Sequence, residues 1–570
     1  MEQGMIEDRH SAQVLIVGGG MVGMIAALDL AQRGVDVILA EQDSSEPPMV
    51  PRANHLSART MEIFRGLGIA DKVRSQGLPD GFANDVAFVT TLTGYELARL
   101  RIPSRRKRFN SIGYIDSDWP TSEPAHRCNQ MYFEPTVRQE VIGNPRIRTL
   151  FGTRIDNFEQ DAAAVFATGR NDAERKAVSI RADYVIGCDG GSSTVRKKIG
   201  GVFEGVDVIS RNRMALVRSP ELLGRLTMEP AWMTWFILPE GHGSVHAIDG
   251  KELWCFHCTL PEGEEDFEKL DRDKVIRAAM GQDIPYEIVH TEDWFGRRLI
   301  SDRFSDGRIF LSGDASHIWI PMAGYGMNAG VSDVTNLTWK LAAVLDGWAD
   351  PAILDSYAVE RRPVTEQVSK FVANIAYENY DVDLRQNPPP ELYEDSVEGE
   401  AVRAEASRFL TDANMGQFNC PGLNFGAVYE GSSIIVPDGE APPPFELGTY
   451  TPTTIPGCRT PHFTLADGTP LYDRMGPGYT LLRTDPAIDV AALVAAAEAR
   501  SVPLTVLDIS AGAADGAYAH KLVLSRPDQY VAWRGNALPD DVMALVDVVR
   551  GVVPANGGAG RKAALVATAG

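Results

Sequence analysis

The order of apolar runs, glycines and polar residues predicts a strand–helix–strand unit near the start of the chain. Val14–Val17 is an apolar run short enough to be one buried strand, and residues 35–39, which lead to Glu41, form the next. Between them, Gly34 stands where a helix that begins at Met21 would end. Three glycines open that helix in the order GxGxxG: Gly18, Gly20 and Gly23. The unit is typical of dinucleotide binding, in which the glycines admit a pyrophosphate to a helix start and the acid holds a ribose diol.

A plain strand–helix–strand unit with a glycine-rich turn is the alternative for a lone GxGxxG motif. Here, however, two later strands end in similar turns. Tyr184–Ile186 runs into a turn with Asp189 and then a basic segment with Arg196. Arg308–Leu311 leads to Asp314, a glycine-rich loop and a long helix with one apolar stripe. We therefore predict three turns that face a phosphate-containing cofactor.

Between these turns the apolar positions change to an alternating pattern. Short β-like runs occupy about 80–120 and 205–300, and the second region is rich in aromatic residues. We predict an antiparallel sheet there, which is either a wall for an aromatic ligand or simply a core. Three of its side chains are candidates for substrate contact: Trp235, His246 and His257. Cys255 and Cys258 form a C-x-x-C on the predicted strand Leu253–Thr259, where residues three apart point to opposite faces, so we interpret them as structural.

The last third of the chain predicts a smaller unit. The acidic, Pro-rich stretch 373–444 is expected to be a linker with some helix near 400–411. Residues 445–555 follow the order strand, helix, three strands, helix, which predicts a thioredoxin-like core without paired cysteines. The small, Gly-rich residues 556–570 are expected to form a loose tail.

Composition and charge narrow the class of protein. At 570 residues the chain can hold more than one domain, and 77 acidic against 55 basic residues give a net charge of −22. That charge argues against nucleic acid or an anionic membrane as a partner. No apolar run approaches the roughly 18 residues of a membrane span, and Met1–Ala12 is too polar for a signal peptide. Six scattered cysteines fit a reducing, cytoplasmic setting, and we expect no metal site.

A polar loop after the first unit carries candidate catalytic residues. Arg52 could reach a cofactor or its phosphates, although a surface arginine is the alternative. Asn54 and His55 follow, and His55 could instead cap the helix that starts near Ser57. Gln130 stands at the entry to another helix, where it could bond a cofactor or cap that helix.

With three turns in this order, the chain resembles the flavoprotein aromatic hydroxylases of the para-hydroxybenzoate and phenol hydroxylase type. The resemblance covers about residues 12–370 and is most specific from Gly313-Asp314 through Asn336-Leu337. Arg59–Glu62 and Tyr132–Pro135 are similar to the branch that acts on phenols such as 2-hydroxybiphenyl and chlorophenols. In that branch a thioredoxin-like C-terminal domain has lost its cysteines and aids dimerisation, so the resemblance implies a homodimer.

The resemblance implies an α/β fold. A Rossmann-like FAD-binding domain of the glutathione-reductase type (1–372) would be interleaved with an antiparallel-sheet substrate domain, followed by the thioredoxin-like domain. The implied FAD-binding residues are Gly18, Gly20, Gly23, Glu41, Arg52, Gln130 and Asp314, with Gly324, Gly326, Met327 and Asn328 beside the isoalloxazine ring. Asp189 and Arg196 would serve both FAD and the co-substrate, NADPH or NADH.

The implied activity is that of an FAD-dependent, NAD(P)H-consuming monooxygenase. O2 adds to the reduced flavin, and the flavin hydroperoxide hydroxylates a phenolic or polycyclic aromatic substrate. The catalytic candidates are Arg52, Asn54, His55 and Pro321. A histidine that some relatives use as a base aligns with Asn54, so either Asn54 only orients a substrate hydroxyl or His55 takes the base role.

The sequence departs from the family pattern at Ala323, which replaces a usual glycine. Two alternatives remain for the function. The same fold could act as an epoxidase or an oxidative-rearrangement enzyme on a polyketide, or the chain could be a flavin-binding protein without oxygenase activity.

Overall fold

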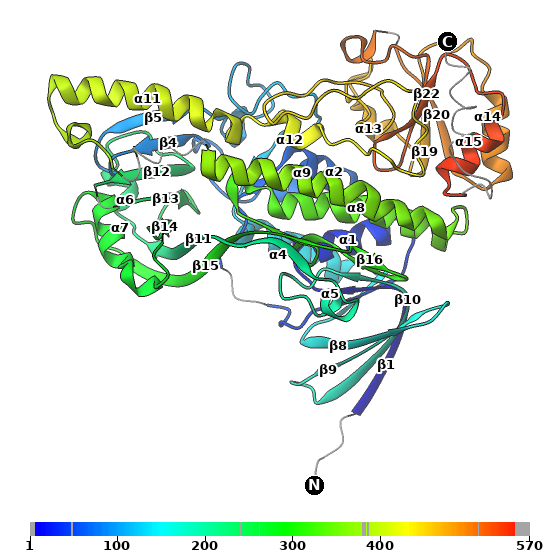
Figure 1. Ribbon diagram of the computed structural model, residues 1–570, viewed down its shortest axis with the longest axis horizontal. Helices are drawn as coiled ribbons and strands as arrows, with labels where there is room; N and C mark the ends of the chain where they lie inside the picture. The colour runs from blue at the N-terminus through cyan, green and yellow to red at the C-terminus, as the bar shows by residue number, and fades with distance from the viewer. Residues whose placement is uncertain are drawn as a thin grey trace.

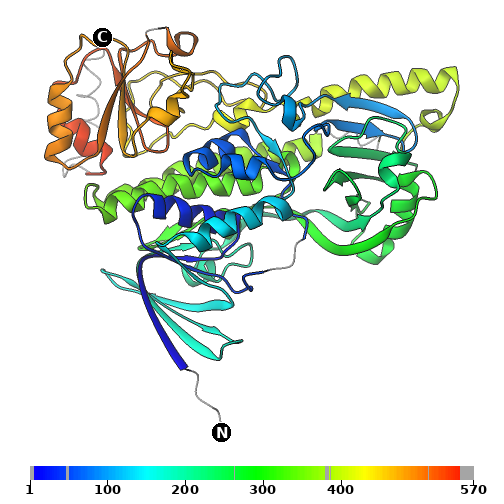
Figure 2. The ribbon, with the colours of Figure 1, turned by 180° about the vertical axis from the view of Figure 1, so that it is seen from behind.

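The computed structural model describes residues 6–46, 50–239, 241–261, 263–378, 384, 387–510 and 512–552. Figure 1 shows a mainly parallel sheet below, a mainly antiparallel sheet on the left and a C-terminal sheet at upper right. Helices α8 (Gly326–Leu345) and α9 (Ser356–Glu378) cross the middle between them, as the view from behind also shows (Figure 2). The predicted tail 556–570 lies outside the described residues.

The parallel sheet confirms the predicted N-terminal unit. Its strands in spatial order are β16 (Ser305–Asp306), β17 (Ile309–Leu311), β10 (Lys176–Gly187), β1 (Ile6–Val17), β2 (Val37–Ala40) and β7 (Ile147–Leu150). Helix α1 (Met21–Gln32) joins β1 to β2, and Gly34 takes the left-handed conformation expected after it, with φ +87°. Helices α2 (Ala58–Gly66) and α4 (Gln130–Gly143) also lie where the apolar pattern predicts helices.

Two strands are longer than the sequence pattern predicts. β1 begins at Ile6 rather than at Val14, and β10 begins at Lys176 rather than at Tyr184. The polar residues 6–12 of β1 pair in parallel with residues 176–182 of β10, and β9 (Val165–Asn171) covers the other edge of β10. β8 (Thr153–Gln160) pairs with β9. Main-chain pairing needs no apolar side chains, so the hydrophobic pattern did not reveal this extension.

The second sheet is the predicted aromatic-rich one. Its strands in spatial order are β18 (His317–Trp319), β15 (Glu287–Ser301), β11 (Phe203–Arg218), β14 (Leu253–Thr259), β13 (Gly241–Ala247), β12 (Met233–Leu238), β4 (Val86–Val89) and β5 (Glu96–Leu100). Among the described strands of this sheet, only β12 and β4 pair in parallel. On β14, Cys255 and Cys258 belong to separate hydrophobic clusters, which confirms that they point to opposite faces. All six cysteines of the chain carry free thiols.

The C-terminal unit has the predicted thioredoxin-like order. Its elements along the chain are β19 (Tyr479–Arg483), α14 (Ala491–Ala499), β20 (Leu504–Asp508), β21 (Leu522–Ser525), β22 (Val531–Gly535) and α15 (Val542–Val549). β20 pairs in parallel with β19, whereas β21 and β22 are antiparallel neighbours. Within the stretch predicted as a linker, α11 (Val397–Phe418) is longer than expected and packs against β5.

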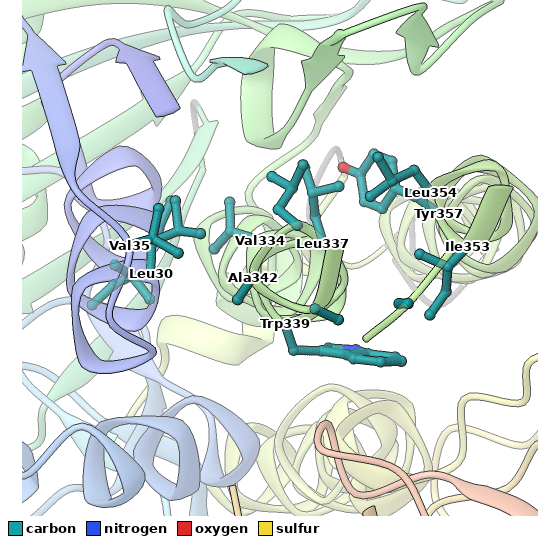
Figure 3. Close-up of a cluster of buried hydrophobic side chains, with 14 of the residues drawn as sticks. Leu30, Val35, Val334, Leu337, Trp339, Ala342, Ile353, Leu354 and Tyr357 are labelled. Carbon is teal, nitrogen blue, oxygen red and sulfur yellow. The ribbon is translucent and has the colours of Figure 1, made fainter. Parts of the chain in front are cut away.

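Helix α8 forms the centre of the main hydrophobic core. Figure 3 shows its apolar side chains between those of the first unit and those of the segment that begins α9. Val334, Leu337 and Ala342 are buried in this layer. The neighbours on either side are Leu30, Val35, Ile353, Leu354 and Tyr357. Trp339 faces the C-terminal unit and packs edge-on against Tyr479, with 6.1 Å between ring centroids.

Helix α8 also carries buried polar residues, and these need hydrogen-bond or charge partners. Lys340 Nζ donates to Asn336 Oδ1 and to Glu360 Oε2 of α9, both at 2.8 Å. Arg526 of the C-terminal unit donates two bonds to Glu360, at 2.6 and 2.8 Å, and another to Asp528 at 2.6 Å. Burial lowers the pKa of Lys340 to about 8, although the charge of Glu360 opposes this. Two cations and two carboxylates thus balance where α8, α9 and the C-terminal unit meet.

Replacing Lys340 with Met should destabilise the protein strongly, because it leaves an excess negative charge buried at this junction. We expect the free energy of unfolding to fall by about 3–5 kcal/mol. Arg277→Met, which breaks an exposed pair with Asp273, is the matched control and should cost less than about 1 kcal/mol. Urea unfolding of both variants measures the difference, and equal small losses would contradict the assignment.

Candidate active site

A cavity of about 1580 Å³ lies between the carboxyl ends of the parallel strands and one face of the second sheet. Gly20, Cys188 and Asp314, which follow β1, β10 and β17, line one side. Trp235 and His257 of the second sheet line the other. Ligand pockets commonly measure about 300–1,000 Å³, so this cavity has room for a cofactor and a substrate together.

The glycine turn has two kinds of glycine. A Cβ on Gly18, at φ +107°, would lie 2.3 Å from the Cys188 carbonyl oxygen, and one on Gly23 would lie 2.0 Å from the Gly18 carbonyl oxygen. These two glycines are required by the packing of the protein itself. A Cβ on Gly20 would meet nothing within 4 Å, and Gly20 lines the cavity. Glu41 Oε2 lies 2.5 Å from the Gly19 amide, so the acid and the turn are adjacent as predicted.

The second predicted turn is engaged within the protein. The Asp189 carboxylate accepts bonds from Ser193 Oγ at 2.5 Å and from the Thr194 amide at 2.6 Å, at the start of α5 (Thr194–Lys198). Arg196 donates to the Ala315 carbonyl at 3.1 Å and its guanidinium lies over the Phe203 ring. These contacts hold the turn in shape, and the cofactor-binding roles of Asp189 and Arg196 stay predictions.

The third turn brings a carboxylate to the cavity. Asp314 opens onto it and accepts no hydrogen bond from any residue that the structure describes. Burial raises the pKa of Asp314, although His317 and Arg52 oppose this. An acceptor without a protein partner at this position is available to a ligand hydroxyl.

The loop from Pro321 to α8 lines the cavity with small residues. Pro321, Gly324, Gly326 and Met327 all border it. Ala323, the residue that departs from the family pattern, takes the left-handed conformation with φ +57°, which glycine adopts more readily. The loop therefore keeps the glycine-like backbone despite the substitution.

Asn328 is the exception in this loop, because its side chain turns away from the cavity. Its Oδ1 accepts bonds from the Ser57 amide at 2.9 Å and from Thr60 Oγ1 at 2.7 Å. Its Nδ2 donates to the carbonyl oxygens of Gly324 at 2.7 Å and His55 at 3.0 Å. The amide side chain thus ties the start of α8 to the loop that carries the catalytic candidates, a role that the sequence did not suggest.

Arg52 and Gln130 also border the cavity. Arg52 is largely exposed, and its Nη1 lies 3.2 Å from Glu292 Oε1 on β15. Gln130 Nε2 donates to Glu134 Oε2 at 2.6 Å. Arg52 therefore links the glycine-turn side of the cavity to the second sheet. Sequence reasoning missed this contact because Glu292 lies 240 positions away.

His55 lies in a cationic environment. It belongs to the short strand β3 (His55–Leu56), which pairs with β6 (His126–Arg127), and its Nδ1 contacts the Arg127 guanidinium. Burial, followed by the charge of Arg127, lowers the pKa of His55 well below its usual range. The cap of α2 is Ser57, whose Oγ accepts the Thr60 amide bond at 3.1 Å, so the alternative that His55 caps this helix is wrong.

The wall of the second sheet presents a row of paired residues to the cavity. Cross-strand pairing places these five side by side on β12, β13, β14, β11 and β15: Trp235, Ser244, His257, Met214 and Glu292. All five line the cavity, so the predicted sheet is a cavity wall on this side and not only a core. Burial lowers the pKa of His257 to about 4. The alternating pattern identified the sheet, but only the register reveals the row.

His246, next to this row, is held on several sides. Its ring stacks on Trp232 with 5.7 Å between centroids, and the His257 ring lies 5.2 Å away. Asn54 Nδ2 lies 2.9 Å from His246 Nδ1. The stretch predicted as a linker also reaches this end of the cavity, through Gln417 and Cys420.

The family follows from two matches to known domains. Residues 11–372 match the FAD binding domain family, and residues 453–553 match the C-terminal domain of aromatic-ring hydroxylases. The chain belongs to the class A flavoprotein hydroxylases. The predicted resemblance and fold class are therefore confirmed.

Several named proteins are similar to this hydroxylase over almost the whole chain. The tetracenomycin B2 monooxygenase-dioxygenase of Streptomyces olivaceus is 30% identical over 95% of this chain and 98% of its own. The 2,4-dichlorophenol 6-monooxygenase of Delftia acidovorans is 28% identical over 91% and 94%. The crystal structure of RebC with bound 7-carboxy-K252c is 33% identical, with a TM-score of 0.86, over 96% of this chain and 100% of that one.

The residues present fit FAD. The open space at Gly20 beside the start of α1 suits a pyrophosphate, since a Cβ there meets no protein atom within 4 Å and no side chain caps the helix start. Asp314 offers an acceptor without a protein partner to a sugar or ribityl hydroxyl. Among the residues described, no cluster of three or more His, Cys, Asp or Glu could hold a metal ion, and no helix is long and apolar enough to cross a membrane.

Replacing Gly20 with Val should give a folded but colourless hydroxylase. The Cβ of the new side chain meets no protein atom within 4 Å and extends into the space proposed for the pyrophosphate. Gly143→Val is the matched control, because a Cβ there also meets nothing within 4 Å and the site is at the exposed end of α4. Flavin absorbance per protein measures the outcome, and full flavin content in Gly20→Val would contradict the assignment.

Proposed function

We propose that this hydroxylase consumes NAD(P)H and O2 and hydroxylates a phenolic or polycyclic aromatic compound. The observation that carries the proposal is the continuity of one cavity from the glycine turn at Gly20 to the aromatic wall at Trp235. Its volume favours a substrate of several fused rings over a single phenol. The names of the relatives, which include enzymes of tetracenomycin and dichlorophenol oxidation, support this substrate range.

Each part of the cavity has a proposed role. The bound flavin supplies the redox and oxygen chemistry. Gly20 admits its pyrophosphate in the turn that Gly18 and Gly23 allow, Asp314 accepts a bond from one of its hydroxyls, and Gly326 presents the start of α8 to its ring. In this proposal Glu41, Arg52 and Gln130 complete the cofactor side as the family resemblance implies.

The second sheet orients the substrate and excludes water. Flat aromatic side chains at Trp235 and Trp294 offer stacking and edge contacts to a planar ligand. Desolvation by these walls strengthens every hydrogen bond that the substrate makes inside. Displacement of water from this wall therefore contributes both to the binding of the substrate and to its orientation.

We infer that His55 is not a general base for the substrate. Its ring contacts the Arg127 guanidinium, and Arg127 in turn donates to Asp116 at 2.9 Å, so a proton on His55 would meet a cation. His257 remains neutral near pH 7 and is a weak base because of burial. In this proposal neither His55 nor His257 removes the proton of a substrate hydroxyl.

The co-substrate and the assembly are the finer parts of the proposal. NADPH or NADH is proposed from the family resemblance alone. The contacts that Asp189 and Arg196 make lie within the protein and do not by themselves indicate a nicotinamide site. A homodimer is likewise proposed from the family resemblance. Oxidative rearrangement of a polyketide is the second candidate, favoured by the large cavity and by the tetracenomycin relative.

A panel of aromatic compounds tests the proposal. The FAD-loaded protein should oxidise NADPH or NADH faster with a fitting polycyclic phenol or quinone, and the product should be one oxygen atom heavier. Product structure by NMR separates ring hydroxylation from epoxidation or rearrangement. If no member of a broad panel accelerates NAD(P)H oxidation, the chain is instead a flavin-binding protein without oxygenase activity.

A further inference from the structure

A chain of amide side chains joins helix α4 to the cavity wall. The Met131 main-chain N–H donates to Asn129 Oδ1 at 3.0 Å. Asn129 Nδ2 then donates to Asn54 Oδ1, and Asn54 Nδ2 lies 2.9 Å from His246 Nδ1. A main-chain N–H can only donate, so it sets the orientation of every amide after it.

The direction of these bonds determines the tautomer of His246. Because Asn129 Oδ1 accepts, Asn129 must donate through Nδ2, which makes Asn54 Oδ1 an acceptor and Asn54 Nδ2 a donor. His246 Nδ1 therefore accepts, and the single proton of the neutral ring lies on Nε2. Burial, and secondarily His257, lowers the pKa of His246 well below its usual range, so the ring is neutral near pH 7.

The Nε2–H of His246 lacks a protein partner. Nε2 is buried and makes no hydrogen bond to any described residue. The residue as a whole is only 7% exposed. Leaving a buried donor unsatisfied costs about 1–3 kcal/mol. The ring cannot turn easily, because Trp232 stacks on it with 4° between the planes and Asn54 holds Nδ1. His246, Asn54, Trp232 and His257 all line the cavity, but Nε2 itself has almost no exposed surface, so a ligand acceptor reaches it only when neighbouring cavity side chains shift.

We propose that His246 Nε2–H binds an acceptor oxygen conjugated to the aromatic rings of the substrate, and that Asn129 and Asn54 are positioning residues for this donor. The inference rests on the proposed function, since it names the group by which that substrate is recognised. A quinone or aryl-ketone carbonyl supplies such an oxygen at any pH, and a phenolate supplies it only after the substrate ionises. A substrate with hydrogen in place of that oxygen leaves Nε2–H unsatisfied and binds more weakly.

The same bond excludes His246 as a base. Nε2 already carries the proton, and Nδ1 is occupied by Asn54. His246 can therefore stabilise a negative or partly negative substrate oxygen but cannot remove a proton from a hydroxyl.

Ligand binding to the FAD-loaded protein without NAD(P)H tests the recognition. The probes are 1,8-dihydroxy-9,10-anthraquinone and 1,8-dihydroxyanthracene, which lacks both carbonyl groups. We expect His246→Leu to weaken binding of the anthraquinone about 5- to 100-fold. Binding of the dihydroxyanthracene should change by less than about threefold. His246→Gln, whose side-chain amide can still donate, should restore most of the affinity. His462→Leu removes a buried histidine of the C-terminal unit and should change neither dissociation constant.

A second readout follows the positioning residues. Nitrogen-15 NMR of histidine-labelled protein should show His246 as the Nε2–H tautomer, with the signal assigned by its loss in His246→Gln. Asn54→Leu should mix the tautomers and weaken anthraquinone binding, whereas a purely structural effect would leave the tautomer unchanged. Binding of 2-naphthol that strengthens with its ionisation identifies the phenolate as a source of the acceptor, and binding unaffected by its ionisation restricts the acceptor to carbonyl groups.

Two results would overturn the inference. One is a His246 ring that carries its proton on Nδ1, or that is charged at pH 7.5. The other is His246→Leu protein that binds the anthraquinone as tightly as the unmodified protein. A protein that passes both tests but produces no hydroxylated product contradicts the proposed function and leaves the donor assignment intact.

Discussion

The structure depends on the need to satisfy the buried polar residues of helix α8. Asn328, Asp333, Asn336 and Lys340 are all almost fully buried, and an unpaired polar or charged group there would cost several kcal/mol. Their partners come from parts of the chain far apart in sequence. Asp333 accepts bonds from His317 at 2.6 Å and from Arg361 at 2.7 Å, while Asn328 holds the loop before α2. The helix thus fixes the cavity walls relative to one another.

The cavity combines two contrasting environments. On the cofactor side, main-chain groups and small residues leave room close to the backbone, as at Gly20 and Gly326. On the substrate side, large aromatic rings and neutral histidines line the wall, and Glu292 pairs with Arg52 where the two sides meet. This division suits a reaction in which the flavin performs the chemistry and the protein chiefly orients a planar molecule and excludes water.

Local patterns predicted the parts of this molecule that depend on neighbouring residues. The turn from Gly18 to Gly23, the stripe of α8 and the C-terminal strand order are each encoded within about 20–100 residues, so periodicity and glycine placement reveal them. The extension of β1 from Ile6 was missed because it depends on pairing with β10 rather than on apolar side chains.

Contacts between distant segments could not be predicted in this way. Asn54 and His246 lie 192 positions apart, and no local pattern indicates that their side chains meet. The sequence identified both as candidates but left open which of Asn54 and His55 could act on the substrate. The register of β13 and the bond from Asn129 supply the missing information, since they determine which atoms are already occupied.

Incorporation of oxygen from labelled O2 distinguishes a monooxygenase from an enzyme that only reduces oxygen. The FAD-loaded protein would be supplied with NAD(P)H, an accepted aromatic substrate and O2 enriched in oxygen-18, and the product analysed by mass spectrometry. The account predicts one labelled atom in each product molecule and the other in water. Consumption of NAD(P)H with unlabelled product, or with all reducing equivalents recovered as hydrogen peroxide, would contradict it.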